Sequence, residues 1–407
     1  MILSKRGSKL VGEPQPLVQA HFKCAKDPYH PIDNPDGYIN LGTAENHLMF
    51  DVLEPKLNQS PQLQEHHTHY DILYGTEPFR NALSSFLSRK LNASISGESL
   101  AIASGSSAIL DMLVNVLCDV GEGIILPSPY YPGFDHDLKV RSGVEPIPAF
   151  LDPNEEFVLT KKALQDAMIN ASKRNIKVKA LLLTSPNNPL GRVYTRDELM
   201  MCINFCKIHK LELIADELYA CSEFGGNKFV SIIPLCNDAK LNVHHVYGFA
   251  KDFTLSGFKV GCLYSTRQEV LDAVRELTYF APVSTHTQHV LTNFISDDTF
   301  IDSFIDTNTK RLQEAWARTS SALNFQHFLH IKPSAGFFVW INLGSYMKNQ
   351  TFEEEFKLYS KLVDGAKVNL SPGKVFHCKE PGWFRMCYAR PAGYIETAIE
   401  RMVKTLG

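Results

Sequence analysis

Short apolar runs alternate with longer segments of helical spacing through the middle of the chain. Two of those segments, residues 106–118 and 196–210, predict amphipathic helices. The apolar runs predict buried strands at residues 123–129, 180–186, 211–217, 244–251 and 259–265. Strands separated by helices are typical of a mostly parallel β-sheet that is covered by helices. The pattern therefore predicts an α/β fold.

The pattern changes after about residue 298. A long polar helix is expected over about residues 300–323, followed by apolar strands at 337–343 and 383–389. This is the pattern of a smaller α+β domain. The first 45 residues have no core pattern of their own, so we expect them to pack beside it. The sequence thus predicts a large domain of residues 46–297, and a small domain of residues 1–45 and 298–407.

Composition and charge narrow the class of protein. The 407 residues are 44% hydrophobic and 21% charged, as in ordinary globular proteins. The 41 Lys and Arg against 44 Asp and Glu give a net charge of −3, with no basic excess for nucleic acid or an anionic membrane. No apolar run approaches the ~18 residues of a membrane span, and the N-terminus does not resemble a signal peptide. With nine dispersed cysteines, read as reduced thiols, we expect a cytoplasmic protein.

Three histidines, His66, His67 and His69, raise the question of a metal site. They lie in a polar segment without matching carboxylate or cysteine spacing. Cys202 and Cys206 are one helical turn apart, but no second ligand pair is in view. A solvated loop and two helix-packing thiols are the expected structures, and no metal site is predicted.

Polar residues follow the predicted strands at the point where each strand ends. Tyr131, Asn188, Asp216, Tyr219 and Lys251 all lie at such positions. In open α/β sheets, ligands bind beyond the carboxyl ends of the strands. We therefore expect these side chains to share one ligand site.

The residue types indicate what that ligand is. Lys251, in an apolar segment, could lose its charge and become a nucleophilic amine. Asp216 at the end of an apolar strand needs a cationic partner, such as a pyridinium nitrogen. Asn188 and Tyr219 could hydrogen-bond a phenolic oxygen, and Tyr131 could stack on a flat ring.

A phosphate site completes the set. Residues 104–107 (SGSS) open a predicted helix, where hydroxyls and free N–H groups suit a phosphate. Each feature alone has a plain structural explanation: a surface lysine, a serine N-cap, a packing tyrosine. Together they indicate pyridoxal 5'-phosphate.

Three motifs carry a family resemblance. SPNNPLG (185–191), ADELY (215–219) and AKDFTLSGFKVG (250–261) stand in the order found in fold-type I aminotransferases of class I/II. The resemblance covers nearly the whole chain and implies the pyridoxal phosphate-dependent transferase fold of type I. Within that family, residues 34–48 (NPDGYINLGTAENHL) and 129–135 (PYYPGFD) most resemble the 1-aminocyclopropane-1-carboxylate (ACC) synthases.

The resemblance implies a role for each matching residue. Lys251 would bind the cofactor covalently and then move the substrate α-proton. Asp216 would keep the ring nitrogen protonated, Tyr219 and Asn188 would bond the phenolic oxygen, and Tyr131 would stack on the ring. The residues that would hold the phosphate are Gly105, Ser106, Ser107 and Lys259, with Tyr74 reaching the phosphate of a neighbouring subunit and Tyr70 as its alternative.

Two residues would bind the substrate. Arg385 would bind the α-carboxylate with its guanidinium fork. An arginine in an apolar strand needs an anionic partner, which supports that role. Glu45 in the Ala-Glu-Asn triplet would lie at the substrate, where the alternative is a solvent-exposed helix-start residue.

The chain departs from the family pattern at three places. Lys259 stands where most relatives place an arginine, and Gly248 where they often place a phosphate-binding serine. A lysine neutralises phosphate without bidentate geometry, so the predicted phosphate site is weaker. Residues 135–137 read Asp-His-Asp where the plant-like synthases have Asp-Arg-Asp, which leaves the exact substrate open.

The expected function is that of a cytoplasmic, homodimeric enzyme acting at Cα of an amino acid. The first hypothesis is ACC synthase-like elimination on S-adenosyl-L-methionine, which releases methylthioadenosine. The alternatives are transamination to a 2-oxo acid and C–S β-lysis of a cysteine conjugate. A catalytically inert binding relative is a further alternative, supported only by Lys259 and Gly248.

Overall fold

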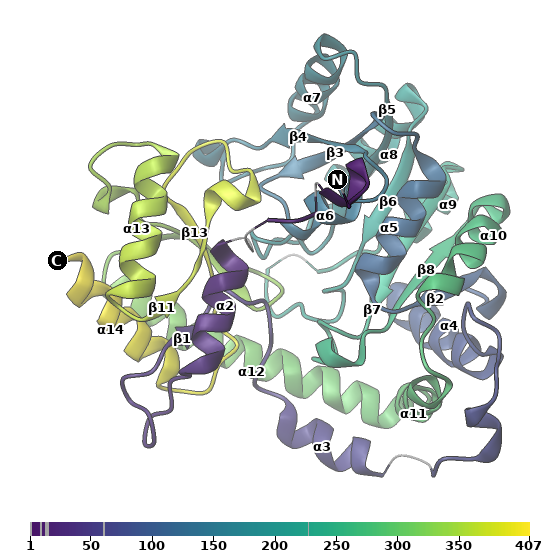
Figure 1. The fold of residues 1–407 in the computed structure, drawn as a ribbon, viewed down its shortest axis with the longest axis horizontal. Helices are drawn as coiled ribbons and strands as arrows, with labels where there is room; N and C mark the ends of the chain where they lie inside the picture. The colour runs from purple at the N-terminus through teal and green to yellow at the C-terminus, as the bar shows by residue number, and fades with distance from the viewer. Residues whose placement is uncertain (1, 9, 13–15, 60–61, 227) are drawn as a thin grey trace.

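A computed structural model describes residues 2–8, 10–12, 16–59, 62–226 and 228–407. Its larger unit is a seven-stranded sheet in the order β2-β8-β7-β6-β5-β3-β4 (Figure 1). The strands are β2 (Leu100–Ala103), β3 (Gly123–Ser128), β4 (Glu145–Phe150), β5 (Val178–Thr184), β6 (Glu212–Asp216), β7 (Val243–Gly248) and β8 (Gly261–Ser265).

The sheet is mostly parallel, as the sequence predicts. Every neighbouring pair from β4 to β7 is parallel, whereas β8 runs antiparallel to both β7 and β2. The link from β7 to β8 contains a single 3-10 turn, Ser256–Phe258, and no helix. A parallel neighbour needs a crossover that is usually helical, so this chain segment returns beside β7 in the opposite direction.

Helices cover both faces of this sheet. Successive side chains of a strand point to opposite faces, so apolar runs such as those of this sheet need a cover on each side. On β3, for example, Ile124 and Ile125 belong to different cores. One face packs against α5 (Ser106–Leu117), α6 (Gly133–Lys139) and α10 (Gln268–Leu277). The other face is covered by α4 (Glu77–Leu91), α7 (Lys161–Lys173), α8 (Arg196–His209), α9 (Ile232–Ala239) and α11 (Thr285–Ile295).

A smaller unit contains an antiparallel sheet in the order β12-β13-β10-β9. Beside it, β1 from the N-terminal part pairs in parallel with β11. The strands are β1 (Ile39–Asn40), β9 (Leu329–Ile331), β10 (Phe338–Asn342), β11 (Val368–Asn369), β12 (Ser371–Pro372) and β13 (Trp383–Cys387). The remaining helices are α1 (Lys5–Ser8), α2 (Pro16–Lys26), α3 (Phe50–Asn58), α12 (Asp298–Phe325), α13 (Phe352–Asp364) and α14 (Tyr394–Leu406).

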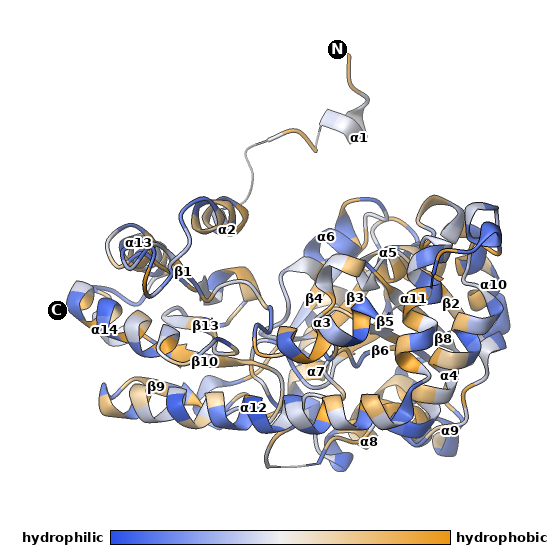
Figure 2. Cartoon of the chain, turned by 90° about the horizontal axis from the view of Figure 1, so that it is seen from below, coloured by the Kyte–Doolittle hydropathy of each residue, from blue (hydrophilic) through white to orange (hydrophobic). Residues whose placement is uncertain are grey.

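The two units are joined by shared packing. Figure 2 shows α12 extending along both of them. Leu218, Tyr219 and Phe224, which follow β6 of the large sheet, are buried in the core of the smaller unit. The carboxyl end of the large sheet is therefore held against the second unit. The domain boundaries at residues 45/46 and 297/298 stay a prediction, and no described helix is long and apolar enough to cross a membrane.

Candidate active site

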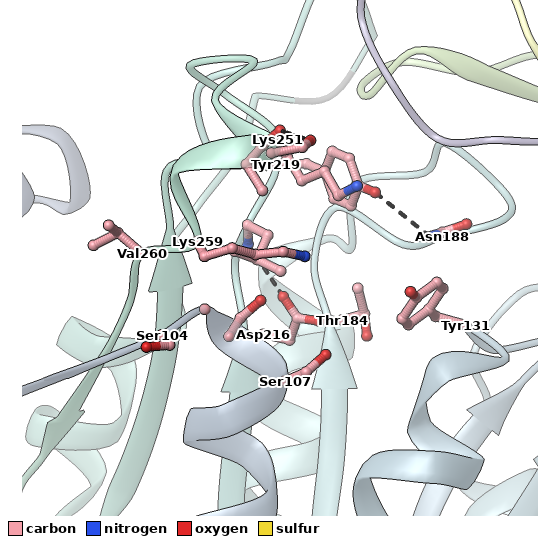
Figure 3. Close-up of a pocket in the computed structure, with 15 residues that line it drawn as sticks. Ser104, Ser107, Tyr131, Thr184, Asn188, Asp216, Tyr219, Lys251, Lys259 and Val260 are labelled. Atoms are coloured by element: carbon pink, nitrogen blue, oxygen red, sulfur yellow. Dashed lines mark hydrogen bonds between the residues drawn. The ribbon is translucent and has the colours of Figure 1, made fainter. Parts of the chain in front are cut away.

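A cavity lies at the carboxyl ends of the parallel strands (Figure 3). It brings together the five strand-end side chains that the sequence predicts to share a site. Residues of four strand ends, the start of α5 and the β7–β8 loop line it: Ser104, Gly105, Ser106, Ser107, Tyr131, Thr184, Asn188, Asp216, Leu218, Tyr219, Ala250, Lys251, Ser256, Lys259 and Val260.

Asp216 is the last residue of β6 and is only 3% exposed. Burial raises the pKa of its carboxyl group to about 7, although the Leu218 amide, 3.2 Å from Oδ1, and the positive charge of Lys251 oppose the rise. A carboxylate that is so poorly solvated is stabilised when a cation binds next to it. The protonated ring nitrogen of pyridoxal phosphate is such a cation, so Asp216 fits that cofactor.

Lys251 follows β7 and lines the same cavity. Burial, reinforced by the nearby Arg385 charge, lowers the pKa of its amine to about 8. The Nζ atom donates a hydrogen bond to the Ala44 carbonyl oxygen at 2.8 Å. At pH 7 about a tenth of this amine is uncharged, which is the nucleophilic form and a far larger share than in an ordinary lysine.

The start of α5 supplies the predicted phosphate site. Gly105 precedes the helix with a φ of +99°, and a Cβ there would meet no atom within 4 Å. The first amides of a helix have no intrahelical partner, so those of Ser106 and Ser107 are available to an anion at the cavity. The hydroxyl of Ser104 already donates to the Ala281 and Pro282 carbonyls. Lys259 contributes a positive charge at the exposed rim.

The structure gives a physical reason for Gly248. It lies at the end of β7, paired with Gly261 of β8. A Cβ at residue 248 would stand 2.9 Å from the Val260 carbonyl oxygen, which is too close without a backbone shift. A serine here would therefore require the neighbouring strand to move away.

Arg385 joins the small sheet to this cavity. Its side chain projects from β13 and is almost fully buried. Nη1 donates to Asn188 Oδ1 at 3.0 Å and Nη2 donates to the Gly42 carbonyl at 2.6 Å, while buried Nε has no partner among the described residues. Asn188 Nδ2 lies 3.5 Å from the Tyr219 hydroxyl. The guanidinium is thus held rigidly beside the strand ends.

A second cavity adjoins the first and shares Tyr131, Lys251 and Ser256 with it. Glu45 and Arg385 line it, opposite apolar residues of α2 that include Phe22. His47 Nε2 lies 3.6 Å from the Glu45 carboxylate and, outweighing burial, keeps the pKa of Glu45 below its usual value. The Glu45 side chain is therefore an anion at a half-exposed mouth.

The two tyrosines that are candidates for contact with a neighbouring subunit have different surroundings. Tyr74 lies outside both cavities, with its ring 5.1 Å from the Arg80 guanidinium and 4.4 Å from that of Arg275. Tyr70 is fully exposed. Neither tyrosine lines a cavity of its own chain, so the assignment of Tyr74, with Tyr70 as its alternative, to the phosphate of a neighbouring subunit stays a prediction.

The histidine segment forms the 3-10 helix Glu65–Thr68. The rings of His66 and His289 each lie 4.1 Å from that of His67. The sequence does not indicate that His289 packs against His67, because His289 lies in α11, far along the chain. In the described part of the chain, no three His, Cys, Asp or Glu side chains are placed to hold a metal ion.

Sequence reasoning also missed several cavity residues. Thr184 ends β5 and Ser256 lies in the β7–β8 loop. Thr184 could have been found, because it is the polar residue that ends an apolar run. Asn369 of β11 and Ser371 of β12 line the second cavity and belong to no recognised motif, whereas Gly42 lies in the segment 34–48 but shows its place in the cavity only in three dimensions.

Comparison with known proteins identifies the family. Residues 37–402 match the aminotransferase class I and II family. The chain is 37% identical over 408 residues to 1-aminocyclopropane-1-carboxylate synthase 8 of Arabidopsis thaliana, covering 95% of this chain and 87% of the relative. It is 33% identical to synthase 2 of Solanum lycopersicum over 97% of this chain and 85% of that one.

Solved structures agree on the fold. Aspartate aminotransferase from Thermus thermophilus with maleate superposes with a TM-score of 0.82 over 99% of both chains, at 21% identity. An aspartate aminotransferase from Thermotoga maritima gives a TM-score of 0.79 over 99% of both chains, at 20% identity. The fold prediction is therefore confirmed, and the chain belongs to the class I and II aminotransferase family.

Proposed function

We propose that this protein is a pyridoxal phosphate-dependent lyase that converts S-adenosyl-L-methionine to 1-aminocyclopropane-1-carboxylate and methylthioadenosine. The observation that carries the proposal is the position of Lys251, whose amine lies where the two cavities meet. The ACC synthase relatives support the same reaction, since they match nearly the full chain.

The first cavity would hold the cofactor. Asp216 would face the ring nitrogen, Tyr219 and Asn188 the phenolic oxygen, and Tyr131 the ring face. Gly105, Ser106, Ser107 and Lys259 would surround the phosphate, with Tyr74, or alternatively Tyr70, of a second subunit. Bound pyridoxal phosphate withdraws electrons from Cα of an attached amino acid and so makes its proton acidic.

The residues of this chain would then direct the reaction. Arg385 would bind the α-carboxylate through two parallel hydrogen bonds and so orient Cα toward Lys251. The uncharged Lys251 amine would accept the Cα proton. The electron pair left on Cα forms the bond to Cγ as the Cγ–S bond breaks, and sulfur keeps the bonding pair. Glu45 would stabilise the positive sulfonium side of the substrate before it leaves as neutral methylthioadenosine.

Transamination is the second candidate. The observation that favours it is the shared fold with aspartate aminotransferases. The same Lys251 and Arg385 would serve both reactions, which differ in where the proton returns. Transamination requires a 2-oxo acid acceptor, whereas elimination requires none.

We also propose that the enzyme is a cytoplasmic homodimer. Tyr70, Tyr279 and Phe280 are exposed aromatic residues, which are candidates for burial against a second copy. Light scattering after size-exclusion chromatography should give twice the chain mass of 45.8 kDa. A single-chain mass at micromolar concentration would contradict the dimer.

Product analysis tests the proposed reaction. Purified protein, pyridoxal phosphate and S-adenosylmethionine are incubated without a 2-oxo acid, and products are identified by mass spectrometry. The proposal predicts equal amounts of aminocyclopropane carboxylate and methylthioadenosine. An amino-group transfer that appears only with an added 2-oxo acid would support the aminotransferase, and pyruvate from a cysteine conjugate would support the C–S lyase.

A further inference from the structure

Two segments that flank the site are joined by hydrogen bonds to backbone carbonyls. The β3–α6 loop carries Tyr131, and the turn Gly373–Phe376 lies between β12 and β13 of the smaller sheet. The Tyr130 amide donates to the Phe376 carbonyl at 2.9 Å, and the Ser128 hydroxyl donates to the His377 carbonyl. These bonds cross between the two units of Figure 1.

Three side chains reinforce this junction. His377 Nε2 lies 2.6 Å from Asp135 Oδ2, and the Tyr130 hydroxyl donates to Asp135 Oδ1 at 3.0 Å. The rings of Tyr130 and His377 stack at 4.5 Å with 19° between their planes. Despite burial, the contact with His377 holds the pKa of Asp135 below its usual value. We call Tyr130, Asp135 and His377 the junction triad.

The triad is adjacent to the site on both sides. Tyr131 follows Tyr130 and lines both cavities. Phe376 precedes His377, and its ring lies 5.0 Å from the Arg385 guanidinium. None of the three triad residues lines either cavity. Any influence they have on the substrate would therefore pass through the cavity residues next to them in the chain: Tyr131 beside Tyr130, His136 beside Asp135, and Phe376 beside His377.

We propose that Asp135 and His377 are positioning residues that set the distance between the Tyr131 ring and the Arg385 guanidinium. This inference rests on the proposed function, in which Tyr131 stacks on the cofactor and Arg385 binds the substrate carboxylate. A substrate bound to the cofactor must reach Arg385, so the separation of these two groups controls substrate affinity.

If the Asp135–His377 pair served only to stabilise the fold, its loss would lower the thermal stability and leave substrate binding unchanged. The exposure of the pair argues against that role. The Asp135 and His377 side chains are 31% and 36% exposed. Ion pairs with this much exposure contribute little to the free energy of unfolding. Loss of the pair should therefore leave thermal stability nearly unchanged while it alters substrate binding.

The test compares three variants of the holoenzyme. His377→Phe keeps an aromatic ring beside Tyr130 but removes the donor to Asp135, whereas His377→Gln restores a donor. The matched control is His30→Phe, which breaks a surface pair with Asp33, 3.0 Å away, in the N-terminal segment. We expect His377→Phe to raise KM about tenfold, with kcat and cofactor affinity within about twofold of the wild type. We expect His377→Gln to recover most of the loss and His30→Phe to change nothing.

A second measurement does not depend on the reaction. Hydrogen exchange at the Tyr130 amide should become faster in His377→Phe and stay unchanged in His30→Phe. Unchanged exchange would overturn the proposal, and so would an unchanged KM or a loss confined to thermal stability. Failure of the proposed function would show itself separately, as a wild-type enzyme that makes neither product from S-adenosylmethionine.

Discussion

The two adjoining cavities are built in different ways. The first is formed at the strand ends of one sheet and has a buried floor that includes Asp216 and Tyr219. Burial there changes the ionisation of its groups, because the pKa of Lys251 falls to about 8 and that of Asp216 rises to about 7. The second is assembled from α2, residues 42–45 and the small sheet, and its Glu45 side chain is 42% exposed. The buried floor of the first cavity favours bond-making at Cα. The second cavity is more exposed and is assembled from distant segments, which favours recognition of a substrate.

Removal of the Lys251 amine should have the largest effect. Lys251→Ala deletes both the covalent attachment and the base, so the rate of product formation should fall at least ~1,000-fold. Lys173→Ala, at an exposed site in α7, serves as the control. Measurable turnover by Lys251→Ala within tenfold of the wild type would break the assignment of chemistry to the first cavity.

Replacement of Arg385 tests the link between the cavities. Arg385→Lys keeps the charge but loses the fork that binds a carboxylate with two hydrogen bonds. Because hydrogen bonds to charged groups contribute ~1.5–3 kcal/mol, kcat/KM should fall about 10- to 150-fold. Steady-state kinetics check this. An unchanged kcat/KM would show that the substrate carboxylate binds elsewhere.

Neutralisation of Glu45 should affect only the second cavity. Glu45→Gln keeps the shape and removes the negative charge, so KM for the sulfonium substrate should rise about tenfold at low salt. The affinity for pyridoxal phosphate, measured by absorbance titration, should stay within twofold. An equal loss of cofactor affinity would contradict the division of labour between the cavities.

The smallest expected effect concerns pH. A lowered lysine pKa means that the uncharged amine prevails above about pH 8 instead of above 10.5. The rate at which the apoenzyme takes up pyridoxal phosphate should rise about fivefold from pH 7 to 8 and then level off. Stopped-flow absorbance measures this. A rate that keeps rising tenfold per pH unit through pH 9 would indicate an unperturbed lysine.

The sequence predicts the first cavity better than the second. Asp216 ends a recognisable strand, Asn188 and Lys251 follow shortly after two others, and parallel strand ends meet at one edge of a sheet. The meeting of Arg385 with Gly42 and of Glu45 with His47 depends on how the small sheet docks, and no local pattern encodes that docking.

Three other features could also be explained only from neighbours in the folded structure. The antiparallel direction of β8 follows from a connection without a helix, which the apolar pattern does not report. Gly248 is explained only by the nearby Val260 carbonyl, and Tyr74 is placed by Arg80 and Arg275. Residue type and strand order therefore predicted the chemistry, whereas side-chain partners across the units required the structure.

The most direct test of the account is to locate the cofactor on the chain. The protein is loaded with pyridoxal phosphate, reduced with sodium borohydride, digested and mapped by mass spectrometry. We predict a single phosphopyridoxyl group, on the peptide that contains Lys251. Labelling spread over exposed lysines, or absent from Lys251, would contradict the assignment of the first cavity as the cofactor site.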